Sequence, residues 1–167
     1  MFMKEPITQK ILSFLHTIGI DTIEKELPDD TFLPGLSLSN KGIEIDFNKL
    51  LYPGDILHEA GHLAVTTAED RNKIGTPEMS TDWPSQGEEI GAMLWSFAAS
   101  QYLEIPLEIV FHDNGYKGSS HWLMESYENE TYIGLPYLEW CGLTLSTEKA
   151  KAQNVKAFPH MIKWLRD

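Results

Sequence analysis

The segment His58-Glu59-Ala60-Gly61-His62 contains the residues whose types and spacing are best suited to chemistry. Two histidines four positions apart on a helix lie on the same face, so both imidazoles can bind one metal ion. Imidazole nitrogen is a good zinc ligand, and a carboxylate beside the first ligand can take a proton from a water molecule that the metal activates. The motif therefore predicts zinc held by His58 and His62, with Glu59 as the catalytic base.

The elements around the motif favour this interpretation. Alternating apolar residues over 36–39 and 43–47, separated by Asn40-Lys41-Gly42, predict a β-hairpin. Asp55 then predicts the N-cap of a helix that runs to about residue 68. Gly61 is unfavourable inside a helix by about 1 kcal/mol relative to Ala, which indicates a packing role. The alternative is two exposed histidines and a solvated Glu, because a shuffled chain of this composition contains the motif roughly one time in fifty.

Apolar periodicity elsewhere in the chain predicts a mainly helical protein. The predicted helices cover residues 7–18, 88–103, 120–128, 135–145 and 159–166, and Trp122, Trp140 and Trp164 are predicted to lie in the core. Residues 75–87 have the composition of a loop. We therefore expect one α+β domain over residues 1–167, with a small antiparallel sheet before the motif helix.

The motif and its context resemble the active-site helix of the zincin metallopeptidases. In zincins the two histidines bind zinc and the Glu between them is the general base, which implies these roles for His58, His62 and Glu59. The resemblance also implies a zincin-like fold in which the upstream strand borders the substrate cleft. The same five residues occur in membrane-bound ATP-dependent metalloproteases, but this chain has neither a P-loop nor a membrane segment.

A catalytic zinc site normally has three protein ligands. Ala68 stands where the extended zincin signature has a third His, so the resemblance implies a Glu from a second helix, as in gluzincins. Glu88 and Glu89 both begin the predicted helix 88–103. Glu89 is favoured because its distance from His62 (89 − 62 = 27 residues) resembles the spacing in the small ImmA/IrrE-like metallopeptidases. Glu88, or neither residue, remains open, since acidic residues are common in the first turn of a helix.

Hydrolysis of this kind usually needs a hydrogen-bond donor that stabilises an oxyanion. His112, Tyr116 and His121 lie in or beside the polar loop 113–120 and are candidates for this role or for substrate binding. The alternatives are structural, because His112 can cap a turn and Tyr116 can lie on the surface. The sequence does not decide among the three.

Composition narrows the class of partner. A net charge of −12 argues against nucleic acid and against anionic membranes, and no apolar run reaches the length of a membrane span. A single cysteine, Cys141, excludes an intramolecular disulfide and is compatible with a cytoplasmic location. The sequence thus predicts a cytoplasmic zinc hydrolase acting on peptides or proteins. The alternatives are an inactive metal-binding scaffold or interaction domain, and a helical adaptor without metal.

Overall fold

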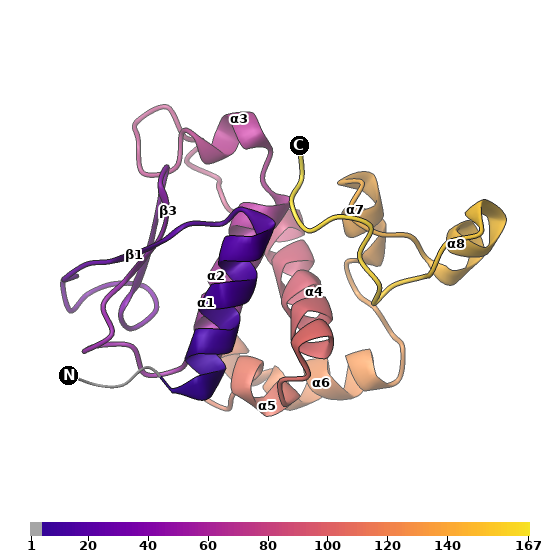
Figure 1. The fold of residues 1–167 in the computed structure, drawn as a ribbon, viewed down its shortest axis with the longest axis horizontal. Coiled ribbons are helices and arrows are strands. Elements are labelled where there is room, and N and C mark those ends of the chain that lie inside the picture. The colour runs from indigo at the N-terminus through magenta and orange to yellow at the C-terminus, as the bar shows by residue number, and fades with distance from the viewer. Residues whose placement is uncertain (1–4) are drawn as a thin grey trace.

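The chain folds into a group of helices with a small sheet at one side (Figure 1). The computed structural model describes residues 5–167. The helices are α1 (Pro6–Ile18), α2 (Gly54–Val65), α3 (Ala68–Arg71), α4 (Gln86–Leu103), α5 (Leu107–Val110), α6 (Ser120–Glu128), α7 (Leu135–Trp140) and α8 (Thr147–Gln153). The remaining elements are the strands β1 (Thr22–Glu24), β2 (Leu36–Ser39) and β3 (Gly42–Ile45) and the 3-10 turn η1 (Tyr116–Gly118). The predicted α+β class is confirmed.

Helices α2 and α4 pack against each other at the centre of the fold and carry the residues of the predicted site. Every residue of α2 except Glu59 is buried. The two helices approach closely at Gly61, where an added Cβ atom would lie 2.6 Å from the backbone oxygen of Ala92. A larger residue would push the helices apart, so the predicted packing role of Gly61 is confirmed.

Helix α2 ends three residues earlier than predicted, because other segments bind its last carbonyl groups. The guanidinium of Arg71 donates to the carbonyl oxygens of Thr66, at 2.6 Å, and of Leu63, at 3.3 Å. The backbone N–H of Arg166 donates to the carbonyl of Ala64 at 2.9 Å. These donors bind carbonyl groups at and just beyond the end of the helix, and they fix the end of α2 against the C-terminal segment.

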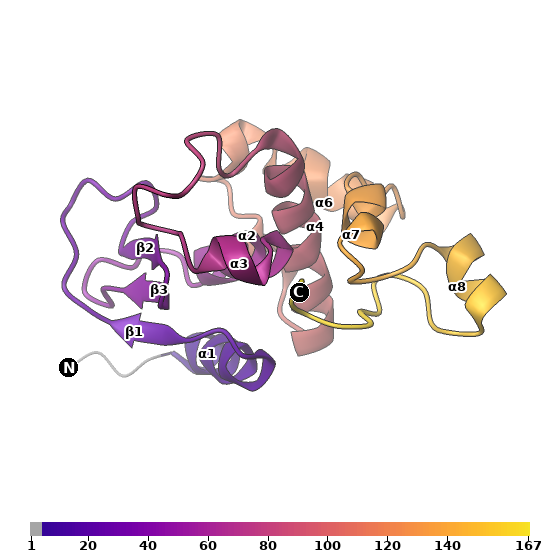
Figure 2. The same cartoon turned by 90° about the horizontal axis from the view of Figure 1, so that it is seen from above.

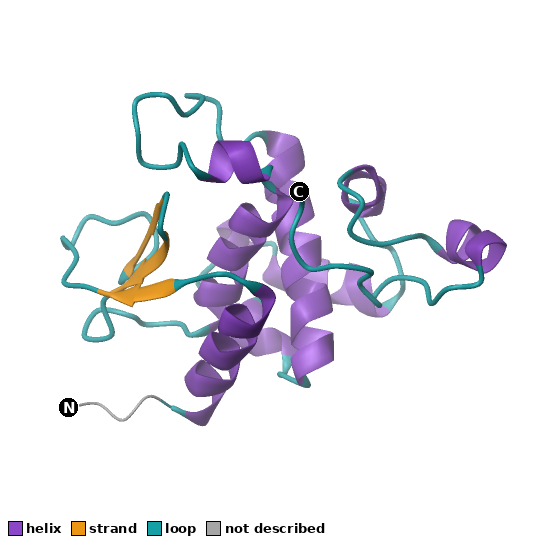
Figure 3. Cartoon of the chain, turned by 45° about the horizontal axis from the view of Figure 1, so that its top comes forward, coloured by secondary structure: helices purple, strands orange, loops and turns teal. Residues whose placement is uncertain are grey.

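The strands lie in the order β1-β3-β2, at one end of the molecule (Figures 2 and 3). Strand β2 pairs antiparallel with β3 as predicted, but β1 pairs parallel with β3, so the sheet is mixed rather than antiparallel. Strand β1 has three residues, which is too short to show a period-2 pattern. Because β3 is central, β2 forms one edge of the sheet.

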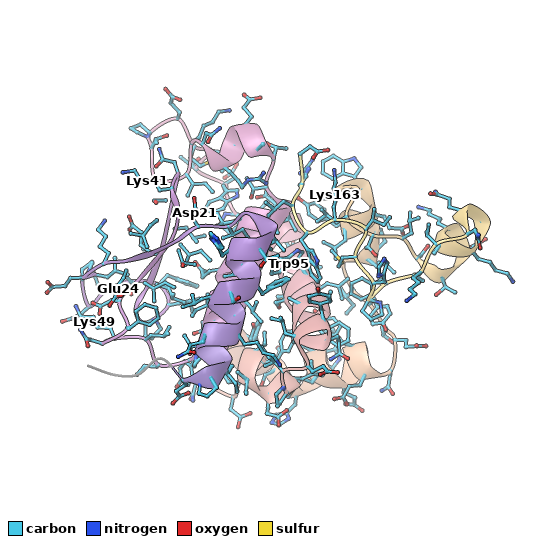
Figure 4. The ribbon with its side chains drawn as sticks, viewed as in Figure 1. Asp21, Glu24, Lys41, Lys49, Trp95 and Lys163 are labelled. Atoms are coloured by element: carbon cyan, nitrogen blue, oxygen red, sulfur yellow. The ribbon has the colours of Figure 1, made fainter. Side chains whose placement is uncertain are left out.

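Aromatic rings join α1, α4 and the C-terminal segment. The indole of Trp95 is completely buried, and its Nε1 donates to the carbonyl of Trp164 at 3.0 Å. The ring of Phe14 lies 5.0 Å from that of Trp164 and 6.2 Å from that of Trp95. Figure 4 shows Trp95 between α1 and α4, whereas the labelled residues Glu24 and Lys49 lie at the periphery. The end of the chain is therefore anchored to the helix that carries Glu89.

The C-terminal third differs most from the prediction. Residues 159–166 form no helix, and α8 lies earlier, in a segment that projects from the body (Figure 1). Trp122 and Trp140 are 55% and 70% exposed, so their assignment to the core is wrong, whereas Trp164 packs against the core as predicted. Helices α6 and α7 are short and bury only one side, and the Arg166 guanidinium lies 4.5 Å from the ring centre of Trp140.

Two further observations bear on the setting of the protein. Among the helices formed by residues 5–167, none is long and apolar enough to cross a membrane. The thiol of Cys141 is buried and free. The cytoplasmic location stays a prediction.

Candidate metal centre

Two helices bring His58, His62 and Glu89 to one point. The Nε2 atoms of the two histidines lie 3.1 Å apart. One carboxylate oxygen of Glu89 lies 3.2 Å from Nε2 of His58, and the other lies 3.1 Å from Nε2 of His62. All three donor atoms fall within 4.8 Å of one another. Two imidazoles and one carboxylate are a donor set that catalytic zinc commonly has.

Contacts in the first turn of α4 distinguish the two candidate ligands, Glu88 and Glu89. Ser85 is the N-cap, and its hydroxyl accepts a hydrogen bond from the backbone N–H of Glu88 at 3.3 Å. The same hydroxyl donates to the Glu88 carboxylate at 3.0 Å. Glu88 is therefore turned toward its own cap, while Glu89 faces α2. The structure places the favoured residue, Glu89, beside the histidines.

The donor atoms converge in a way that suits a cation. Both histidines are buried, and in the described chain the Nδ1 atom of each is buried without a hydrogen-bond partner. Their Nε2 atoms face each other and the two oxygens of Glu89. Burial tends to raise the pKa of Glu89, but hydrogen bonds and charge from His58 and His62 hold that pKa well below its usual range. The carboxylate is thus ionised and ready to bind a cation.

Glu59 lies at the margin of this cluster. Its carboxylate oxygen is 4.0 Å from Nε2 of His62, so it approaches the cluster without bonding to it. Burial raises the pKa of Glu59 to about 7, and the charges of Glu89 and Asp55 add to this effect while His58 opposes it. The structure thus places the predicted base beside the predicted ligands. Its environment raises its pKa, whereas that of Glu89 lowers the pKa.

Asp55 and His112 form a second grouping, one turn before His58. The Nε2 atom of His112 donates to the Asp55 carboxylate at 2.7 Å, and both side chains are mostly buried. The ring of Tyr52 stacks on that of His112 with 3.9 Å between centres. The prediction that Asp55 caps α2 is wrong, because the helix begins at Gly54 and Asp55 binds a residue 57 positions away. His112 is thereby directed to Asp55 and does not reach the cluster.

Tyr116 does reach the cluster. Its ring lies edge-on to that of His58, with 5.5 Å between centres and an angle of 84°. Its hydroxyl is buried and has no hydrogen-bond partner in the part of the chain that the structure describes. Burial raises the pKa of Tyr116 well above its usual value, and the charges of Asp55, Glu89 and Glu59 also raise it. The phenol is therefore protonated and has a free O–H donor near the candidate ligands.

The backbone at Tyr116 is held in an uncommon conformation. Its φ is +58°, in the left-handed region that residues other than glycine seldom occupy. Such a conformation persists where surrounding contacts impose it, and it occurs often at functional sites. His112, four residues earlier, is fixed by Asp55, so the loop between them is anchored to α2.

His121 lies elsewhere. Its side chain is 82% exposed, and its Nε2 is 3.0 Å from the equally exposed carboxylate of Asp113. Within residues 5–167 it makes no hydrogen bond, ion pair or ring contact with the cluster. Of the three sequence candidates for an oxyanion donor, the structure brings only Tyr116 to the site.

A cavity of about 410 Å³ opens beside the cluster, and sequence reasoning missed most of its lining. Glu59, His62 and Glu89 form one wall, and the edge strand β2 contributes another. Trp83 also lines it, with its indole 6.2 Å from the ring of His62. Trp83 lies in a polar loop without periodicity, so no pattern in the sequence could have assigned it to the site.

Comparison with known proteins gives no family for this chain. No family model matches it, and no curated protein or solved structure matches it. The resemblance to zincins therefore stays a prediction from the sequence.

Proposed function

We propose that this protein is a zinc-dependent hydrolase that cleaves peptide bonds, with a zincin-like arrangement of its active site. The observation that carries the proposal is the convergence of His58, His62 and Glu89 from α2 and α4. Three buried or half-buried donors of the types that zinc prefers meet at one point, and a cavity opens beside them. A structural zinc site would more commonly have four protein ligands.

Zinc bound by these residues would polarise a carbonyl group and make a water molecule more acidic. Glu59 lies on the cavity wall within 4.0 Å of His62, where its carboxylate can accept a proton and later return it to the leaving nitrogen. Tyr116 can donate its unpartnered O–H to an oxygen that gains negative charge. In this proposal Glu59 and the ligands His62 and Glu89 lie at the cavity, and Tyr116 approaches the centre from the side of His58.

The edge strand supports a peptide rather than a small molecule as substrate. Strand β2 pairs with β3 on one side and lines the cavity with Leu36, Ser37 and Leu38. An extended peptide beside an edge strand can pair with its backbone. This position of a strand beside the candidate centre resembles the zincin substrate cleft.

The test combines metal content with hydrolysis. Untagged protein purified without chelator is assayed for zinc and for cleavage of a mixed library of internally quenched peptides, as wild type and as Glu59→Gln. We expect about one zinc per chain in both proteins, and cleavage by the wild type at a rate at least about 100-fold above that of the variant, the scale of general acid–base catalysis.

Three outcomes are informative. Zinc with Glu59-dependent cleavage supports the proposal. Zinc in both proteins with cleavage in neither contradicts the hydrolase and leaves a metal-binding scaffold. Wild-type protein that binds no zinc, even when zinc is added, contradicts the metal centre itself.

A further inference from the structure

The cavity beside the candidate metal centre has two kinds of wall. The polar wall consists of Glu59, His62 and Glu89, which belong to the centre. The other lining residues come from the segment before β2, from β2 itself and from the loop before α4: Thr31, Phe32, Leu33, Leu36, Ser37, Leu38, Trp83 and Pro84. Most of these side chains are apolar, so the space next to the centre is largely hydrophobic.

Some residues of this apolar lining are held in place by other contacts, whereas Phe32 is exposed to solvent. Trp83 is held in place because its Nε1 donates to the hydroxyl of Thr66 at 3.0 Å, and Leu36 is part of the core. Phe32, by contrast, is 95% exposed, the largest exposed fraction among the large hydrophobic residues that the structure describes. An exposed aromatic ring at the rim of a cavity is apolar surface that a ligand can cover.

Charge restricts what the cavity can accept. Its described lining contains no Lys or Arg, and its charged groups are the carboxylates of Glu59 and Glu89. An acidic side chain that lies in the apolar part of the cavity, away from a zinc ion held by His58, His62 and Glu89, would face Glu59 with no basic partner, which is unfavourable in a site partly shielded from water. An acidic side chain at this position is disfavoured for this reason.

We propose that this cavity binds a large aliphatic or aromatic side chain next to the bond that is hydrolysed, so that the substrates are peptides with such a residue at that position. The proposal rests on the proposed function and adds its substrate class. A volume of about 410 Å³ holds one large side chain with part of the neighbouring backbone. Phe32 would fold over that side chain from the rim, and Trp83 would form its floor.

Amino-acid hydroxamates test the cavity separately from catalysis, because the hydroxamate group binds zinc while the side chain explores the space beside it. Binding of glycine, leucine and aspartate hydroxamates to zinc-loaded wild-type protein is measured by calorimetry. We expect the leucine compound to bind about 10- to 100-fold more tightly than the glycine compound, the effect of burying an apolar side chain. The aspartate compound should bind no more tightly than glycine hydroxamate.

A matched pair of variants locates the effect. Phe32→Ser removes the exposed ring at the rim, and Leu51→Ser removes an apolar side chain that is 64% exposed but does not line the cavity. We expect the preference for leucine over glycine to fall at least about threefold in Phe32→Ser and to stay unchanged in Leu51→Ser. Because both side chains are exposed, neither change should impair folding.

The outcomes separate the two proposals. Equal binding of the glycine and leucine compounds, or an equal loss of preference in both variants, overturns the apolar subsite and leaves the metal centre intact. Tighter binding of the aspartate compound also overturns it. Wild-type protein that takes up no zinc when zinc is added overturns the proposed zinc centre and this inference with it.

Discussion

Helix α2 bears two groupings of histidine and carboxylate, one turn apart, and they differ in what they can do. In the first, Asp55 meets His112, which comes from the segment after α5. In the second, His58 and His62 meet Glu89 of α4. Both groupings are largely buried and both use the same residue types.

The difference lies in the number of donors and in how their atoms are occupied. Asp55 and His112 satisfy each other with one hydrogen bond of 2.7 Å, and Tyr52 covers the imidazole. The second grouping directs two imidazole nitrogens and both oxygens of Glu89 at a single point. A pair of this kind holds two segments together, whereas three convergent donors can hold a cation. Residue type alone therefore does not define a metal site.

The largest effect should come from the third ligand. Glu89→Ala removes one of three donors, and zinc affinity should fall by more than about 100-fold, since even loss of an outer hydrogen-bond partner costs about 10- to 100-fold. Glu88→Ala is the matched control, because Glu88 is the neighbouring carboxylate but binds the Ser85 cap. Competition with a chromogenic zinc chelator measures both.

The comparison of these two variants can also contradict the assignment of Glu89 as the third ligand. A loss of zinc affinity in Glu88→Ala equal to that in Glu89→Ala would mean that the first turn of α4, rather than one carboxylate, determines binding. Unchanged affinity in Glu89→Ala would remove Glu89 from the ligand set.

The second effect concerns the Asp55–His112 pair. His112→Ala leaves the buried Asp55 carboxylate without its partner, which should lower the free energy of unfolding by about 3 kcal/mol while zinc stoichiometry is unchanged. His121→Ala is the control, because it removes a His–Asp contact that is exposed on both sides and should leave stability unchanged. Urea unfolding of the zinc-free proteins measures the difference.

The loss in His112→Ala should depend on pH in a defined direction. Burial raises the pKa of Asp55, and His112 opposes this rise in the wild type. Without His112 the folded-state pKa rises further above the unfolded value, so folding favours the protonated carboxyl. The stability deficit should therefore shrink as pH falls through the raised pKa and grow as pH rises. A deficit that is the same at all pH values would show that lost packing, rather than an unpaired carboxylate, is the cause.

Tyr116 lies between the two groupings, and its substitution should affect catalysis alone. Tyr116→Phe keeps the ring against His58 and removes a buried hydroxyl that has no partner in residues 5–167. We expect kcat to fall by about 10- to 100-fold if that hydroxyl stabilises an oxyanion, with zinc affinity and stability unchanged. A variant with full kcat in the peptide assay would assign Tyr116 a packing role only.

The sequence predicted those parts of the site whose residues lie close together along the chain. Two histidines four apart fix their own geometry once a helix forms. The hairpin of β2 and β3 was predicted for the same reason, because its register depends on a short turn. The choice of Glu89 over Glu88 was not local in this sense, because it came from the resemblance of its separation from His62 to that in the ImmA/IrrE-like metallopeptidases. Contacts over long separations were missed: Asp55 binds His112 across 57 residues, and no pattern near either residue indicates this.

Surface position was equally hard to predict. Phe32 and Trp83 line the cavity from irregular segments, where side-chain direction has no period. Trp122 and Trp140 lie in helical segments with apolar residues, yet both are exposed because α6 and α7 each bury only one side. Periodicity indicates that a segment is helical more reliably than it indicates which large residue faces the core.

The smallest effect tests whether α4 positions Glu89 through its cap. Ser85→Ala removes the hydroxyl that accepts from the backbone of Glu88, and loss of such a cap destabilises a protein by about 1 kcal/mol. Glu89 also bonds through its backbone N–H to the Ser85 carbonyl at 2.9 Å, and this bond survives the substitution. We therefore expect zinc affinity to fall less than about tenfold, much less than in Glu89→Ala, while thermal unfolding of the zinc-free protein shows the lost cap. Ser85→Thr keeps the hydroxyl and should leave both quantities unchanged, whereas a loss in Ser85→Ala as large as that of Glu89→Ala would mean that the cap, and not the α2–α4 packing, holds the third ligand in place.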